Sequence, residues 1–111
     1  MRTTATRQAL PIPGSPSAAR FAVDAAGWIR AARDLAAAGG CLLSLWATRP
    51  SSTASATVRA AVLIDGRALV LELSVPDLAL SYPGLREIFP SAGRMQRAAL
   101  DLCGIRSDDA D

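Results

Sequence analysis

The chain has 111 residues, with 12 arginines, 10 acidic residues and neither histidine nor lysine, and half of its residues are hydrophobic. This length suits one compact domain with its own core, and the composition argues against disorder. The missing side chains exclude Ser-His triads, histidine metal ligands and lysine nucleophiles, and a net charge of +2 is not a nucleic-acid-binding signature.

The two cysteines, Cys41 and Cys103, lie far apart and form no CxxC motif. With so few sulfur and nitrogen ligands, we expect no iron–sulfur cluster, no other metal, no cofactor and no catalytic residue. No secretory leader begins the sequence, so both cysteines are expected to be reduced, buried thiols in a cytoplasmic protein. No apolar run approaches the roughly 20 residues that cross a bilayer, so no membrane insertion is expected. The alanine-rich, lysine-free composition indicates a GC-rich, bacterial genome.

Residues 1–20 contain three prolines and show no sustained period, which predicts a flexible N-terminal tail. The first ordered element is predicted to be a helix from Ala25 to Ala38. Asp24 is a favourable N-cap, and Gly39-Gly40 would end the helix. Trp28 lies on the apolar face of this helix and is expected in the core.

A strand is predicted next over Cys41–Thr48, which is almost wholly apolar, as in a central strand buried on both faces. Trp46 is therefore expected in the core rather than at an interface. Two alternating runs follow on either side of Asp65-Gly66, the favoured sequence of a type I′ hairpin turn. This turn predicts a register that places Arg59 directly opposite Glu72, with apolar residues paired on the other face.

After a short helical turn near Leu85–Ile88, a second helix is predicted over Ala92–Cys103, capped by Ser91 and ended by Gly104. Its apolar stripe is predicted to consist of Met95, Ala98, Ala99 and Leu102. Residues 107–111 predict a solvated, acidic C-terminal tail. The predicted fold class is α+β in the order α-β-β-β-α, with helices packed on an antiparallel three-stranded sheet that leaves room for an extra edge strand.

A polar stripe of the second helix, Arg94, Arg97 and Asp101, is the one constellation that suggests a function. It could be a solvated face with one local ion pair between Arg97 and Asp101. It could instead be a docking face, because arginine binds carboxylates and carbonyls bidentately and is enriched at interfaces. Arg97 could also bind the carbonyl groups of the Phe89-Pro90 turn, which would be an internal role.

The stretch from Tyr82 to Ile105 resembles the signature near the end of the 30 kDa subunit family of the respiratory-chain NADH dehydrogenase, complex I. The residues that match at the same spacing are Phe89, Pro90, Ala92, Arg97, Asp101, Gly104 and Ile105. The resemblance covers about residues 21–106, which are identified as a domain similar to that 30 kDa protein. The motif Arg-Met-x-Arg at 94–97 more closely resembles the sequence of another domain. That domain is at the start of the large subunit of formate-hydrogenlyase-type (group 4) [NiFe] hydrogenases.

The resemblance implies a non-catalytic structural or assembly domain of a complex-I-like or [NiFe] hydrogenase complex. Its implied partners are the catalytic large subunit and the iron–sulfur subunits, and its implied location is cytoplasmic, associated peripherally with the membrane through the complex. Arg94, Arg97 and Asp101 are then the subunit-interface candidates. The alternatives are a homo-oligomeric protein-binding module, whose dimer buries Trp46 and the sheet edge, and, third, an arginine-dependent enzyme.

Overall fold

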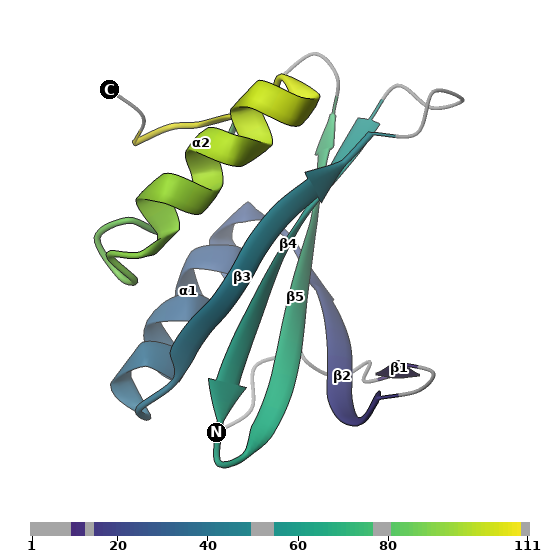
Figure 1. The fold of residues 1–111 in the computed structure, drawn as a ribbon, viewed down its shortest axis with the longest axis vertical. Helices are drawn as coiled ribbons and strands as arrows, with labels where there is room; N and C mark the ends of the chain where they lie inside the picture. Colours follow the sequence, from purple (N-terminus) through teal and green to yellow (C-terminus); the bar gives the residue numbers. More distant parts are fainter. Residues whose placement is uncertain (1–9, 13–14, 50–54, 77–80, 110–111) are drawn as a thin grey trace.

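The computed structural model describes residues 10–12, 15–49, 55–76 and 81–109, and their fold is α+β. The elements in chain order are β1 (Leu10–Ile12), β2 (Ser15–Val23), α1 (Ala25–Ala37), β3 (Cys41–Thr48), β4 (Ser55–Ile64), β5 (Arg67–Pro76), β6 (Ser81–Tyr82), α2 (Ala92–Cys103) and β7 (Arg106–Ser107). Five strands form one sheet in the order β1-β2-β5-β4-β3, and β6 and β7 form a small parallel pair. Both helices cover the same face of the large sheet (Figure 1). No helix of the described residues lies on the other face, which we call the open face.

The hairpin of β4 and β5 has the predicted register. Ile64 pairs with Arg67, and Arg59 pairs with Glu72. Asp65 and Gly66 both have positive φ, 51° and 74°, as a type I′ turn requires. The register is therefore confirmed, and it directs the apolar set of both strands toward the helices.

The expected flexible tail over residues 1–20 is corrected for the part that the structure describes, because residues 10–12 and 15–20 lie in β1 and β2. β2 runs parallel to β5, with Arg20 beside Val70 and Val23 beside Leu73. The sheet therefore has two more strands than the three that were predicted, and one of its pairings is parallel. Parallel pairing joins residues that are far apart in sequence, so a local sequence pattern does not predict it.

The prediction that β3 is a central strand is wrong, because β3 is the last strand of the sheet. A bulge between Leu42 and Ser44 leaves Leu43 outside the pairing with β4. The extra residue allows both Leu42 and Leu45 to be buried, although they are three positions apart. Leu43 itself is 48% exposed, so one face of this apolar strand lacks a covering layer.

The two helices form where they were predicted. In α1 the carboxylate of Asp24 accepts a hydrogen bond from the Gly27 backbone N–H at 2.7 Å, which confirms the N-cap. α2 ends at Gly104, whose φ of 72° is left-handed and favours glycine. The Ser91 side chain makes no capping hydrogen bond, so that part of the prediction is wrong.

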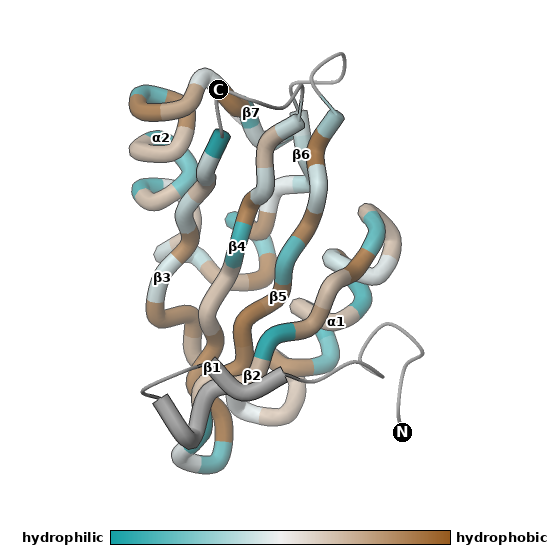
Figure 2. Tube along the Cα trace, turned by 90° about the vertical axis from the view of Figure 1, so that its right-hand side faces the viewer, coloured by the Kyte–Doolittle hydropathy of each residue, from teal (hydrophilic) through white to brown (hydrophobic). Residues whose placement is uncertain are grey.

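The core lies between the helices and the sheet. Brown, apolar residues recur along the strands of the sheet (Figure 2). Trp28 of α1 is fully buried, as predicted, and its indole Nε1–H donates to the Pro83 carbonyl oxygen at 2.9 Å. The Trp28 ring also meets the buried Tyr82 ring edge to face, with 6.3 Å between centroids. These contacts hold the chain around β6 against α1, and so position the turn that leads into α2.

Candidate functional site

A buried amide connects α2 to the end of the described chain. Gln96 is 4% exposed, and its Oε1 accepts a hydrogen bond from the Leu85 backbone N–H at 2.8 Å. Its Nε2 donates to the Ser107 hydroxyl at 3.1 Å and to the Asp109 carboxylate at 2.9 Å. The amide oxygen and both amide hydrogens thus have partners, which is the usual condition for burying a glutamine. We call Leu85, Gln96, Ser107, Asp108 and Asp109 the C-terminal clamp.

The carboxylates of the clamp complete the turn that precedes α2. Asp108 accepts from the Gly84 backbone N–H at 2.8 Å, and Asp109 accepts from the Arg86 backbone N–H at 3.1 Å. The Arg86 guanidinium also donates to the Asp109 carbonyl oxygen at 2.7 Å. The prediction of a solvated acidic tail over residues 107–111 is therefore wrong for the buried Ser107 and the partly buried Asp109. Asp108 is exposed, as predicted, but it is hydrogen-bonded to the turn, and residues 110–111 lie outside the described residues.

The charge state of the clamp follows from these contacts. Burial alone would raise the pKa of Asp109, but hydrogen bonds from the Ser107 hydroxyl, the Arg86 backbone N–H and Gln96 together hold that pKa below its ordinary value. Burial, and secondly the Asp109 carboxylate, raise the pKa of Tyr82. Asp109 is therefore a fixed anion at neutral pH, close to a neutral, buried phenol.

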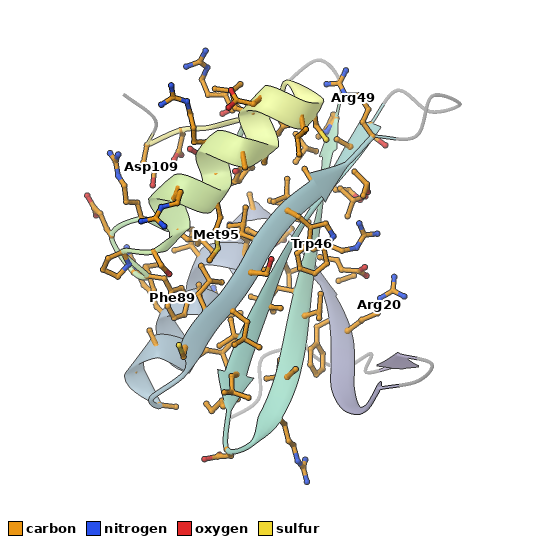
Figure 3. All side chains as sticks on the ribbon, in the orientation of Figure 1. Arg20, Trp46, Arg49, Phe89, Met95 and Asp109 are labelled. Atoms are coloured by element: carbon orange, nitrogen blue, oxygen red, sulfur yellow. The ribbon has the colours of Figure 1, made fainter. Side chains whose placement is uncertain are left out.

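Gly84 is required by the same packing, because a Cβ on Gly84 would overlap the Asp109 carboxylate. The Asp109 side chain lies on the helix side of the molecule, beside the start of α2 (Figure 3). The backbone of the turn can approach this carboxylate closely only where no side chain intervenes.

A pocket of about 340 Å³ opens next to the clamp. It is lined by Arg86, Gly93, Gln96, Arg97, Leu100, Asp101 and Ser107. Two of the three predicted interface residues, Arg97 and Asp101, therefore lie at one concave site, and Arg94 is exposed one turn before Arg97 on the same helix. The pocket combines guanidinium and carboxylate groups with a buried amide, a set that suits a polar or charged side chain of a partner protein.

The polar stripe makes no internal bond in the part of the chain that the structure describes. Arg97 and Asp101 are both exposed, and no ion pair joins them within 4.0 Å. The carbonyl oxygens of Phe89 and Pro90 accept backbone N–H groups of α2 rather than the Arg97 guanidinium. The predicted local ion pair is therefore absent from the described residues, as is the internal role considered for Arg97.

The predicted apolar stripe of α2 is only partly correct. Ala99 is buried and Met95 partly buried, but Ala98 is exposed and Leu102 is 84% exposed. The buried stripe instead runs through Ala92, Gln96 and Ala99 to the partly buried Cys103. Gln96 was missed because the predicted buried stripe contained apolar residues only. Its position four residues after Ala92 and three before Ala99 is the signal that could have found it.

The residues that match the family signature divide into two groups. Phe89, Ala92 and Ile105 are buried in the core, and Gly104 supplies the left-handed helix end, so packing and backbone geometry account for them. Pro90, Arg97 and Asp101 are exposed. Folding alone gives no reason for the exposed charged residues at positions 97 and 101.

Two predictions about buried residues are wrong. Trp46 is 36% exposed on β3 because neither helix of the described residues covers the open face. Cys41 is exposed at the start of the same strand. Cys103 is partly buried, and its thiol donates to the Ala47 carbonyl oxygen at 3.2 Å. Its surroundings therefore fit the expected packing role.

Within the described ranges, no group of three or more cysteine and acidic side chains is placed so that it could hold a metal ion. No helix in the same ranges is both long enough and apolar enough to span a bilayer.

Comparison with known proteins gives no sequence match, since neither a protein-family model nor a curated protein matches this chain. Among the similar solved structures are two that each have a TM-score of 0.77 and 15% identity over 93% of this chain. One is the trypsin-resistant fragment (1–134) of Nqo5, of which 88% is covered. The other is a chain of the membrane-bound sulfane sulfur reductase, an archaeal respiratory membrane complex, of which 64% is covered. At this identity the likeness establishes the fold, and this chain is built on the α+β fold of the Nqo5 fragment.

Proposed function

We propose that this chain is a non-catalytic structural or assembly domain of a complex-I-like NADH dehydrogenase or a membrane-bound [NiFe] hydrogenase of the formate-hydrogenlyase type. The signature between Tyr82 and Ile105 and the fold of the Nqo5 fragment support the same proposal from independent directions. The second neighbour is part of a respiratory membrane complex, which is consistent with a role as one subunit among several. The proposed partners are the catalytic large subunit and the iron–sulfur subunits, in a cytoplasmic, membrane-peripheral part of the complex.

The observation that carries the proposal is the outward polar face of α2. Arg94, Arg97 and Asp101 are exposed, and no hydrogen bond or ion pair links them to other described residues. Even an exposed ion pair at this helical spacing would contribute only about 0.3–0.5 kcal/mol to an isolated domain. A desolvated arginine at an interface can contribute about 2 kcal/mol or more to binding. The stripe is therefore better suited to binding another subunit than to stabilising this one.

The proposal is tested with the variant Arg97→Ala in the tagged full-length chain, purified from its own host. The melting temperature of the isolated chain should stay within about 3 °C, because an exposed residue without an internal partner contributes little to folding. Recovery of the catalytic and iron–sulfur subunits should fall about tenfold or more. Arg67→Ala is the matched control, because Arg67 is an exposed arginine at the hairpin, away from α2. Normal recovery with Arg97→Ala, or a melting temperature lower by about 10 °C or more, would refute the docking role.

A homo-oligomeric binding module is the second candidate, and the exposure of Trp46 on an edge strand favours it. A dimer that buries Trp46 would appear in light scattering of the isolated chain as twice the 11.5 kDa monomer mass. It would return to the monomer mass in Trp46→Thr, because threonine suits a strand but presents much less apolar surface. A monomer at high micromolar concentration would exclude this candidate.

A further inference from the structure

A row of four side chains on neighbouring strands crosses the open face of the sheet. Trp46 on β3 pairs with Arg59 on β4, which pairs with Glu72 on β5. Arg59 Nε donates to Glu72 Oε2 at 2.7 Å, and Arg20 of β2 donates to the same oxygen from Nη2 at 2.7 Å and from Nε at 3.1 Å. Figure 3 shows Arg20 and Trp46 on the side of the sheet away from α2. We call these four residues the open-face row.

The open-face row has more positive charge than its own carboxylate can balance. Two guanidinium groups share one carboxylate, and that carboxylate is held ionised because hydrogen bonds from Arg59 and Arg20 outweigh the effect of burial on the pKa of Glu72. Each guanidinium has five N–H donors, and Arg59 uses only one of the others, from Nη1 to the Thr48 hydroxyl at 2.9 Å. The remaining donors have no partner among the described residues. The row thus presents a net positive charge with directed, unused donors.

Apolar side chains are also exposed on the two strands that carry Trp46 and Arg59. Trp46 is 36% exposed, Leu63 on β4 is 40% exposed and Leu43 at the bulge of β3 is 48% exposed. They account for three of the four large exposed hydrophobic residues in the described part of the chain. Arginine next to tryptophan, with further apolar residues around them, is the composition found at the energetic centre of protein interfaces.

We propose that the open face binds a segment of another subunit that carries a carboxylate side chain flanked by apolar residues. The carboxylate would accept the unused N–H groups of Arg20 and Arg59, and its apolar neighbours would pack on Trp46 and Leu63. A second copy of this chain fits less well, because it would bring the same excess of positive charge to the same place. The inference rests on the proposed function, and it adds a second docking surface on the side of the sheet opposite α2.

The test uses the tagged full-length chain purified with its complex, with p-benzoylphenylalanine incorporated in place of Trp46. Ultraviolet light should cross-link position 46 to another polypeptide, and the cross-linked segment should contain aspartate or glutamate next to apolar residues. The control places the same photoreactive residue at Arg67, where no cross-link is expected. A cross-link from position 46 to a second copy, to a segment without a carboxylate, or to nothing while the other subunits co-purify would overturn the inference and leave the proposed function intact. If the other subunits do not co-purify even with the unsubstituted chain, both the inference and the proposed function are refuted.

Variants separate the two components of the surface. Trp46→Thr should lower recovery of the cross-linked subunit by about tenfold or more, the effect of truncating an interface centre. Arg20→Gln should lower recovery less and should make the remaining recovery less sensitive to salt, because one charge pair is lost. Arg20 is the safer choice for removing charge, because its side chain is 43% exposed and that of Arg59 only 23%. Unchanged recovery with Trp46→Thr, in a variant whose melting temperature matches the wild type, would also overturn the inference.

Discussion

Replacing Gln96 by leucine removes the amide at the centre of the C-terminal clamp. This amide links α2 to the turn before it and to Ser107 and Asp109. The structure allows the cost to be estimated. The Leu85 backbone N–H would be left buried without an acceptor, which costs about 1–3 kcal/mol, and Asp109 and Ser107 would each lose a donor. We expect a total loss of about 2–4 kcal/mol, since leucine regains part of it through apolar burial. Because the whole free energy of unfolding of such a domain is about 5–15 kcal/mol, the change should be large.

The assay is thermal and urea denaturation, combined with hydrogen exchange at the Leu85 amide. The melting temperature should fall by about 8–30 °C, since about 1 kcal/mol shifts it by about 4–8 °C in a domain of this size. The Leu85 amide should lose its protection, because Gln96 Oε1 is its acceptor. Arg94→Ala, on the exposed face of the same helix, is the control and should change the melting temperature by less than about 3 °C.

A second variant distinguishes the role of the Gln96 amide oxygen, which accepts a hydrogen bond, from that of the amide nitrogen, which donates two. Gln96→Glu retains an acceptor for the Leu85 N–H but places a carboxylate where Nε2 now donates to Asp109. The new carboxyl should have a raised pKa, so its effect on stability should be most unfavourable above that pKa. The difference from wild type should therefore shrink as the pH falls from about 7 to about 5. An unchanged midpoint in Gln96→Leu, with a protected Leu85 amide, would refute this account of the clamp.

Three further predictions concern the clamp, the sheet and the hairpin. Gly84→Ala should destabilise the chain by about 1–3 kcal/mol in urea denaturation, because the added methyl group overlaps the Asp109 carboxylate; equal stability would contradict the described approach. The pKa of Glu72 and that of Asp109 are both lowered from ordinary values of 4.5 and 3.8, so their contribution to stability is present above those values and is lost as the pH falls through the lower folded pKa values. Acid titration of the free energy of unfolding should show this decrease, and Glu72→Gln should reduce its steepness. Gly66→Val should cost about 1 kcal/mol or more, since Gly66 has a φ of 74° and a β-branched residue resists it; an unchanged urea midpoint would speak against strain at this turn.

Only some residues of the candidate site could be predicted from the sequence. Arg97 and Asp101 could be selected because charged residues at helical spacing indicate one face of a helix, and the structure places both at the pocket. Gln96 could not be selected by polarity alone. A buried glutamine is favourable only when its donors and acceptors are satisfied, and its partners lie on a turn and on a terminal segment that a helical pattern does not include.

The sequence by itself determined the features that depend on neighbouring residues. Asp65-Gly66 specifies positive φ at both turn positions, and the alternation around it leaves one register that buries the apolar set, so the pairing of Arg59 with Glu72 followed. Asp24 and Gly104 similarly define where α1 begins and where α2 ends. In each case the determining interaction spans only a few residues.

The tertiary structure decided which faces of the strands and helices are covered and which distant segments pair with them. The exposure of Trp46 depends on whether a layer covers the open face, and no residue of β3 carries that information. The pairing of β2 with β5 and the capture of Asp108 and Asp109 by the turn before α2 both join segments distant in the chain. An apolar strand can be central or peripheral, and an acidic segment can be solvated or hydrogen-bonded, because burial and pairing are properties of the assembled layers rather than of local sequence.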